Sequence, residues 1–158
     1  MHEFLMENSA IISKCGKYRY ELRRIWDKHK PWVLFICLNP STADQLKEDN
    51  TSRVCVGYAK RWGYGGVVIA NLFAYRSTDK YTLYKVSDPV GPKNDEHLKR
   101  LSSEAIVTVC AWSDDGALMN RDLSVLPLLS SPKCLVKLKS GRPGHPLYKR
   151  KDLEPIPL

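Results

Sequence analysis

Three apolar runs without polar alternation are the feature that most constrains how this chain folds. They cover residues 32–38, 67–70 and 106–111. A strand with one face in water alternates apolar and polar side chains, so continuous runs of this kind predict strands that are buried on both faces. Helical patterns separate the runs. This order predicts an α/β fold, a three-layer α/β/α sandwich with a mainly parallel central sheet.

Two helices are predicted between the buried strands. Residues 49–52 offer several N-cap side chains before an apolar stripe at helical spacing, which covers residues 54–62 and stops at Gly63. Pro92 stands in the first turn of a second helix, whose buried stripe continues to Ala105. The helices therefore connect successive strands, as parallel pairing requires.

The flanking segments carry weaker patterns. Residues 18–26 are aromatic and alternate imperfectly, which predicts an edge strand, and residues 134–138 predict a short strand. Ser113 is placed to cap a further helix, because the acidic residues 114–115 suit the positive end of a helix dipole. The tail from about residue 140 is rich in proline and is expected to be irregular.

Length and composition predict a single α/β domain over residues 1–158, enough chain to bury a stable core. The longest apolar run is far below the roughly 18 residues of a membrane helix, so no membrane partner is expected. Met1 is not followed by a basic and apolar leader, so export is not expected either. Five cysteines without a C-x-x-C pair and four scattered histidines predict a cytoplasmic protein with no metal or other cofactor. The oligomeric state stays open.

The net charge of +8 favours a polyanionic partner, a nucleic acid or nucleotide. Residues 123–151 contain seven basic residues and no acidic one. The candidate phosphate ligands in this run are Arg142, Lys149, Arg150 and Lys151. A solvated face that aids solubility is the alternative interpretation, and it is preferred for a second basic cluster at residues 14–30.

Polar clusters follow each buried run. The first run is followed by Asn39, Pro40, Ser41, Thr42 and Asp44, the second by Asn71 and the third by Trp112. The carboxyl ends of parallel strands border the ligand crevice of an open α/β sheet, so we expect these clusters to share one base-binding or nucleotide-binding cleft. His145, in the basic tail, is expected to be functional. Each cluster also has a simpler interpretation as a turn or a strand-end cap.

Four motifs in fixed order resemble a known family. They are LNPSTAD at residues 38–44, NLFAYR at 71–76, DPVGPKND at 88–95 and GHPLY at 144–148. Together they closely resemble DUF1643, a bacterial and phage family of unknown function, over roughly residues 18–157. That family is in turn similar to the uracil-DNA glycosylase superfamily, which implies a uracil-DNA glycosylase-like fold.

The superfamily resemblance implies roles for several residues. Asn39-Pro40 is similar to the loop that positions the attacking water, and Asn71 matches an asparagine that reads the base edge. His145 matches the histidine that stabilises the departing base, and Leu147-Tyr148 stands in the place of the wedge that enters a duplex. Trp112-Ser113 resembles a Trp-Gly pair after the third strand.

The chain departs from the superfamily pattern at three places. Leu38 replaces a glycine of the first loop, Ser113 replaces the glycine after tryptophan, and Leu147-Tyr148 replaces Ser-Pro. These departures bear on substrate identity and on catalysis.

Three functions remain open from the sequence. In the first, a flipped base is cleaved from its sugar, with Asn39 holding the water or with Asp44 or Asp49 activating it. In the second, the cleft binds a nucleotide or modified base without cleaving it, and Arg53 or Arg76 clamps a phosphate. In the third, the basic surface makes the domain a scaffold that binds nucleic acid.

Overall fold

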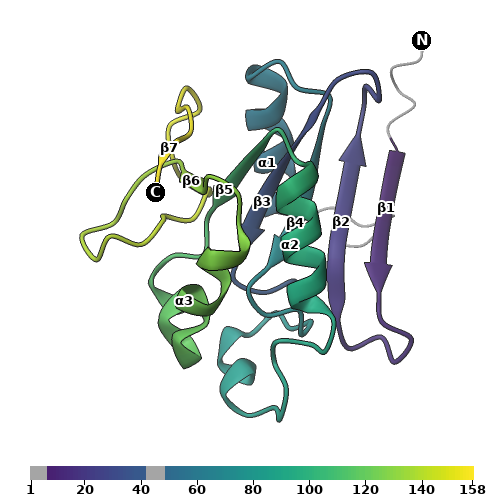
Figure 1. Cartoon of the computed structure of the whole chain (residues 1–158), viewed down its shortest axis with the longest axis vertical. Coiled ribbons are helices and arrows are strands. Elements are labelled where there is room, and N and C mark those ends of the chain that lie inside the picture. Colours follow the sequence, from purple (N-terminus) through teal and green to yellow (C-terminus); the bar gives the residue numbers. More distant parts are fainter. Residues whose placement is uncertain (1–6, 42–48) are drawn as a thin grey trace.

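The three apolar runs form the centre of one sheet in the computed structural model, which describes residues 7–41 and 49–158 (Figure 1). The described part of the chain contains seven strands in the order β1-β2-β4-β3-β5-β6-β7. Their bounds are β1 Glu7–Ile12, β2 Arg19–Ile25, β3 Trp32–Cys37, β4 Gly66–Asn71, β5 Val107–Cys110, β6 Lys133–Cys134 and β7 Ile156–Pro157.

The sheet is parallel at its centre and antiparallel at both edges. β4, β3, β5 and β6 run parallel, with Val33 opposite Val67 in the β3–β4 pair. β1 and β2 form a hairpin, β2 pairs antiparallel with β4, and β7 pairs antiparallel with β6. The predicted α/β class is confirmed, and the sheet as a whole is mixed.

The edge position predicted for residues 18–26 is wrong. β2 lies inside the sheet, because β1 pairs with its outer side and places Ala10 opposite Leu22. The strand was hard to place from sequence because it buries charged residues, Glu21 and Arg24, which are 0% and 1% exposed. Such residues are almost never fully buried unless they have a partner.

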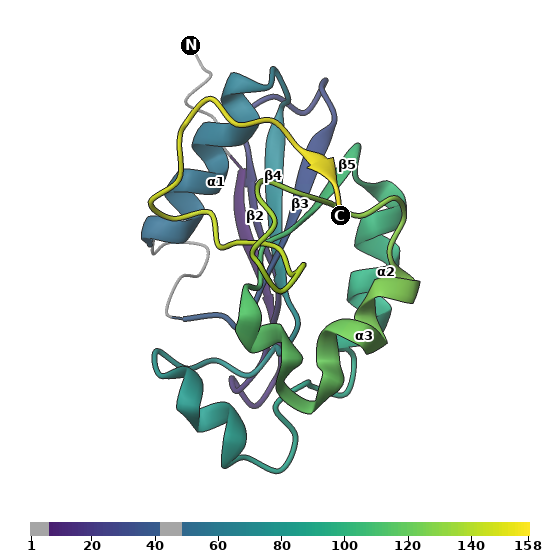
Figure 2. The same ribbon diagram turned by 90° about the vertical axis from the view of Figure 1, so that its left-hand side faces the viewer.

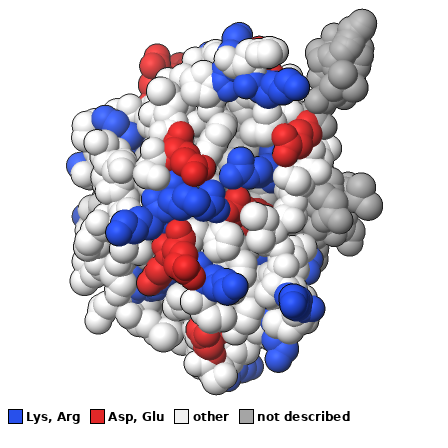
Figure 3. Space-filling model, turned by 45° about the vertical axis from the view of Figure 1, so that its right-hand side comes forward, with Lys and Arg blue, Asp and Glu red and all other residues white. Residues whose placement is uncertain are grey.

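The buried carboxylate of Glu21 joins β2 to helix α2 (Asn94–Glu104). It contacts Arg23 at 3.2 Å, His97 Nδ1 at 2.6 Å and the guanidinium of Arg100. Burial acts to raise the pKa of Glu21, but the hydrogen bond with His97 and the nearby arginines outweigh it and lower that pKa. Basic and acidic side chains interleave on this side of the molecule (Figure 3), as expected for a paired, solvated surface.

Helices cover both faces of the sheet (Figure 2). On one face lies α1 (Asn50–Arg61), the first predicted helix, which buries Tyr58 against the sheet. On the other face lie α2, the second predicted helix, which buries Leu101, and the short α3 (Arg121–Val125). The core therefore has two apolar layers, one on each side of the sheet.

The segment after β5 differs from the predicted helix. Ser113 has a φ of 60°, and its side chain accepts no capping hydrogen bond. A 3-10 segment, η2 (Asp114–Asn120), precedes α3. This turn packs closely over a buried indole, because a Cβ on Gly116 would lie 2.2 Å from Cδ1 of Trp112. The acidic first turn was visible in the sequence, but this packing was not.

The C-terminal tail is irregular, as expected, except for the two-residue strand β7 at its end, and it is held against α1. The Tyr58 hydroxyl donates to the Arg150 carbonyl at 2.6 Å, and the Trp62 indole donates to the Leu153 carbonyl at 2.9 Å. The preceding strand β6 is shorter than the predicted strand at residues 134–138. These contacts hold the segment that follows His145.

The connections from β3 and β5 leave the sheet on opposite faces. β3 leads to α1 on one face, whereas β5 leads through η2 to α3 on the other. The carboxyl ends of these two adjacent strands thus form a topological switch point, where open α/β sheets bind ligands. No helix in the described ranges is long and apolar enough to cross a membrane.

Candidate functional site

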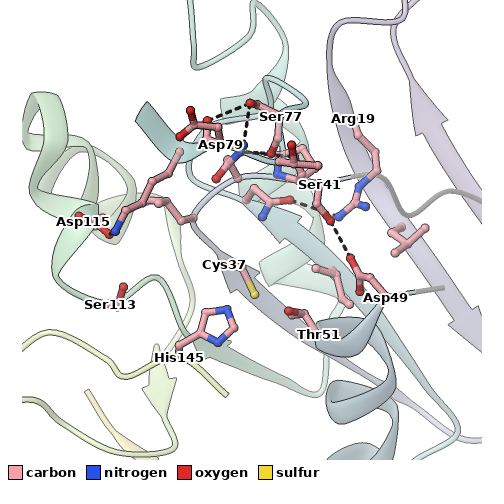
Figure 4. Close-up of a pocket in the computed structure, with 18 of the residues that line it drawn as sticks. Arg19, Cys37, Ser41, Asp49, Thr51, Ser77, Asp79, Ser113, Asp115 and His145 are labelled. Carbon is pink, nitrogen blue, oxygen red and sulfur yellow. Dashed lines mark hydrogen bonds and ion pairs between the residues drawn. The ribbon is translucent and has the colours of Figure 1, made fainter. Parts of the chain in front are cut away.

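A cavity of about 550 Å³ opens at the carboxyl ends of β3 and β4 (Figure 4). Its lining comes from β2, the two strand ends, the start of α1, the connection after β4, the turn after β5 and the C-terminal tail. His145 lies across the cavity from Ser77 and Asp79 (Figure 4). The volume is in the range of small-molecule sites.

Several of the residues proposed from sequence line this cavity. They are Asn39, Pro40, Ser41, Asp49, Asn71 and His145. Thr42 and Asp44 lie outside the described residues. Polar groups from separate segments therefore converge at the predicted end of the sheet.

Asp49 joins the cavity wall to the start of α1. Its Oδ1 accepts the Ser52 backbone N–H at 2.8 Å as the helix N-cap, and its Oδ2 accepts the Ser41 hydroxyl at 2.9 Å. Burial acts to raise the pKa of Asp49, but these hydrogen bonds and the charge of Arg19 outweigh it and lower that pKa. The cavity thus holds an ionised carboxylate with a fixed orientation.

His145 faces the cavity as a neutral imidazole. Its Nδ1 accepts the Leu147 backbone N–H at 3.2 Å, so the ring proton of the neutral form sits on Nε2. Burial and then the charge of Lys149 lower the pKa of His145, and the opposing effect of Asp49 is smaller. At neutral pH the ring is therefore an uncharged donor through Nε2.

Arg19 and Asn71 form a polar pair deep in the cavity. They are 3% and 2% exposed, and Arg19 Nη2 lies 3.5 Å from Asn71 Oδ1. Burial lowers the pKa of Arg19 to about 10, against the opposing charge of Asp49, so the guanidinium stays protonated at neutral pH. The carboxamide oxygen of Asn71 therefore lies beside a buried cation.

Comparison with known proteins places the chain in a protein family. Residues 19–147 match DUF1643, whose description is a protein of unknown function. The chain belongs to DUF1643. The matched region runs from Arg19 through the His145 loop, so it includes the cavity residues of this DUF1643 protein described above. No curated protein and no solved structure matches the chain.

Asn39 braces the connection that forms one rim of the cavity. Its Nδ2 donates to the Ser77 carbonyl at 3.0 Å and to the Pro40 carbonyl at 3.3 Å. Ser77 in turn donates its backbone N–H to the Pro40 carbonyl at 2.9 Å. The amide nitrogen of Asn39 therefore orders the loop, as the turn interpretation expected, while the side chain lines the cavity.

Trp112 does not line the cavity, contrary to the expectation. It is 1% exposed and packs in the apolar layer beneath α2 and α3. Its Nε1 has no hydrogen-bond partner among the described residues. The following residue, Ser113, reaches the cavity instead, because the turn after β5 directs the indole into the core.

Four further candidates lie away from the cavity lining. Arg53 is exposed on α1 and donates to Asn50 Oδ1, and Arg76 donates to the Gly16 carbonyl at 3.3 Å. Leu147 is half-buried, whereas Tyr148 is 98% exposed with a φ of 61°. The two residues proposed as a wedge thus follow His145 in the chain but do not line the cavity.

Carboxylates hold two of the four proposed phosphate ligands. Arg142 Nε donates to Asp122 at 2.8 Å, and Arg150 pairs with Asp152 through two contacts at 2.7 and 3.0 Å. Both carboxylates stand just outside the acid-free run of residues 123–151, so the sequence pattern alone overstated its free charge. The other two candidates are Lys149 and Lys151.

Sequence reasoning missed Arg19 and the rim at residues 77–81. β2 is antiparallel to β4, with Leu22 opposite Ile69, so the first residue of β2 lies at the carboxyl end of β4. This pairing brings Arg19 to Asn71 across a long stretch of chain, and no local pattern reveals it. Within the described residues, no three His, Cys, Asp or Glu side chains are grouped to hold a metal ion.

Proposed function

We propose that this cavity binds a nucleobase with its sugar, free or within nucleic acid, and hydrolyses the N-glycosidic bond. One observation carries the proposal: an ionised carboxylate, Asp49, and a neutral imidazole donor, His145, share one cavity. Bond cleavage creates positive charge on the sugar and negative charge on the base. The two side chains match these two developing charges.

His145 is assigned to the departing base. The C–N bond breaks with its electron pair moving to the base, and Nε2–H of His145 donates a hydrogen bond to the oxygen on which negative charge collects. The loop keeps this proton on Nε2, because Nδ1 already accepts from Leu147. A preorganised donor of this kind is worth about 3 to 4 kcal/mol of transition-state stabilisation.

Asp49 is assigned to the sugar and the water. Its negative charge stabilises the oxocarbenium-like sugar, and it accepts a hydrogen bond from the water that adds to the anomeric carbon. The proton lost by that water ends on the departing base or in solvent. Ser41 and Ser52 hold the carboxylate in place, so little reorganisation is needed.

Asn71 is assigned to reading the base edge. Arg19 contacts its Oδ1, which leaves Nδ2 as the donor for a base carbonyl. The parallel order β4-β3-β5-β6 and the likeness of Asn39-Pro40 and His145 to superfamily motifs support a three-layer, uracil-DNA glycosylase-like fold. Substrate identity is set at Asn71 and at the positions where the chain departs from that pattern.

The test is release of free base. Purified protein is incubated with pooled natural and modified nucleic acids and nucleotides, and released base is detected by mass spectrometry. Asp49→Asn and His145→Ala are each expected to slow single-turnover release by about a hundredfold or more, whereas His29→Ala at an exposed site leaves it unchanged. Release that survives both cavity substitutions would contradict the assignment.

A buried cation in the cavity favours one other function, binding without cleavage. Arg19 presents positive charge to an anionic ligand in a desolvated site, where such an interaction is strong. In that case a nucleotide binds tightly and is recovered intact after prolonged incubation. That result would replace hydrolysis with sequestration as the function of the cavity.

A further inference from the structure

Two exposed tyrosines stand on the rim of the cavity. Tyr81 and Tyr84 lie on η1 (Lys80–Tyr84), a 3-10 helix in the connection after β4, and each is 61% exposed. Residues three apart eclipse one another on a 3-10 helix, so both rings project from the same side. Their centroids are 6.5 Å apart with 24° between the planes. We call this pair the tyrosine ledge.

The tyrosine ledge is fixed on its support. Leu83, between the two rings in sequence, is 2% exposed and anchors η1 in the apolar layer beneath it. Asp79 caps η1 by accepting the Tyr81 backbone N–H at 2.9 Å. The exposed rings are therefore held out by a packed turn, and binding would cost little ordering of the backbone.

The ledge continues the wall of the cavity outward. Tyr81 lines the cavity with Asp49 and His145, whereas Tyr84 is not among the lining residues and extends the aromatic surface beyond the rim. A ligand no larger than one nucleotide would occupy the cavity and leave Tyr84 bare. Only a ligand that continues past the rim uses both rings.

Two lysines flank the ledge, together with the carboxylates of Asp79 and Asp115. Lys80 Nζ lies 5.7 Å from the centre of the Tyr81 ring and pairs with Asp115 at 2.6 Å, and Lys85 follows Tyr84 and is exposed. Aromatic faces beside lysines are the recurring surface for single-stranded nucleic acid, because every base has a face to stack and every linkage carries a phosphate. A duplex hides its base faces.

We propose that the tyrosine ledge stacks bases adjacent to the one held in the cavity, so that the ligand is a single-stranded nucleic acid segment. The inference rests on the proposed function for the base in the cavity and adds the class of its substrate. Tyr81 takes the neighbouring base and Tyr84 takes the next one.

The test compares oligonucleotide and mononucleotide binding. A fluorescently labelled single strand of about eight nucleotides and the matching mononucleotides are titrated with wild type, Tyr84→Ala and Tyr81→Ala. Stacking losses predict roughly 5- to 150-fold weaker oligonucleotide binding for each alanine variant, with mononucleotide binding by Tyr84→Ala within about twofold. Tyr84→Phe keeps the ring and is expected to restore binding.

Two controls make the result specific. Leu123→Ala removes an apolar side chain that is 62% exposed on α3, away from the cavity lining, and is expected to leave oligonucleotide binding unchanged. A duplex of the same sequence is expected to bind wild type more weakly than the single strand. Three results would each overturn the proposed role of the tyrosine ledge. They are equal oligonucleotide binding by Tyr84→Ala and wild type, absence of oligonucleotide binding, and a duplex that binds as well as the single strand.

The outcomes separate this inference from the proposed function. Ledge-dependent oligonucleotide binding without any base release supports the ledge and rejects hydrolysis. Base release from oligonucleotides that is equally fast in wild type and Tyr84→Ala under subsaturating conditions supports hydrolysis and rejects the ledge.

Discussion

His145 makes the cavity sensitive to acid at the scale of one residue. Protonation of Nδ1 would remove the acceptor for the Leu147 N–H, and burial, followed by Lys149, places the pKa of His145 below its ordinary value of 6.5. The unfolded chain therefore binds this proton more readily than the folded one. Above about pH 6.5, His145 is neutral in both the folded and the unfolded chain and does not lower the free energy of unfolding. That free energy declines as the pH falls from there through the lowered pKa of His145.

We therefore expect His145→Gln to make folding stability less sensitive to acid. Urea unfolding at about pH 7.5 and about pH 5 measures this, and the decrease between the two should be smaller in the variant than in wild type. The rate of base release by wild type should fall over the same interval, because the protonated ring loses its fixed geometry. If stability depends on pH identically in both proteins, His145 does not contribute to the acid sensitivity of the fold.

Gly116 shows how a single missing Cβ shapes the turn beside the cavity. A Cβ there would lie 2.2 Å from Cδ1 and 2.8 Å from Nε1 of Trp112. Gly116→Ala should destabilise the fold by about 1 to 3 kcal/mol, because the indole is fully packed. Gly57→Ala in α1 is the matched control. There the nearest atoms belong to the flexible side chain of Arg61, and the variant should be neutral or stabilised by up to about 1 kcal/mol in urea unfolding.

At the scale of elements, α1 depends on the same carboxylate as the proposed chemistry. Asp49→Ala removes the N-cap and should cost about 0.5 to 2 kcal/mol, whereas Asp49→Asn keeps an equally good cap and should cost much less. Base release should fall in both variants, because neither keeps the charge. Urea unfolding beside single-turnover kinetics separates the two roles. If Asp49→Asn releases base as fast as wild type, Asp49 serves only as the N-cap of α1.

The same helix end should respond to acid. The folded pKa of Asp49 is lowered from its ordinary value of 3.8, so its contribution to stability is complete above that value and is lost as the pH falls through the lower folded pKa. Asp49→Asn should lose less stability than wild type over this interval in acid unfolding monitored by circular dichroism. A parallel decline in both proteins would contradict the lowered pKa.

At the scale of the whole molecule, we expect the basic tail to set the salt dependence of nucleic-acid binding. Replacing Lys149, Arg150 and Lys151 by alanine should reduce the salt slope of nucleic-acid binding by roughly two to three units. A value near two is expected, because Arg150 already pairs with Asp152. A variant with alanine at Lys14, Lys28 and Lys30, three exposed lysines of the other basic cluster, removes the same charge. An equal effect of both variants would show that net charge, rather than position, matters.

How far the sequence predicts the fold depends on whether the signal is local. The apolar runs predicted β3, β4 and β5, because burial on both faces leaves a continuous pattern. The N-cap candidates at residues 49–52 located α1 for the same local reason, and the structure selects Asp49 among them. β1 could not be found in this way, since half-exposed residues such as Ala10 carry little pattern, and the interior place of β2 follows from its pairing with β1.

The candidate site also contains residues that a local signal predicts and residues that only tertiary pairing places there. Strand ends predicted that Asn39 and Asn71 converge, because parallel strands finish at one edge of the sheet. Arg19 could not be predicted, because an antiparallel pairing brings it there, and Trp112 was misplaced because side-chain direction at a strand end is decided by packing. Residues 77–81 reach the rim through tertiary contacts with Asn39 rather than through any motif of their own.

Asp49 is both the N-cap of α1 and part of the cavity wall, so a ligand in the cavity is expected to affect local opening of the first turn of α1. One of its oxygens closes the first turn of α1 through the Ser52 amide, while the same carboxylate lines the cavity. A ligand that restrains this carboxylate must also restrain the turn, since binding and local opening compete for one group. Hydrogen–deuterium exchange at the Ser52 amide therefore becomes slower in proportion to saturation, and reports ligand binding even when no bond is cleaved.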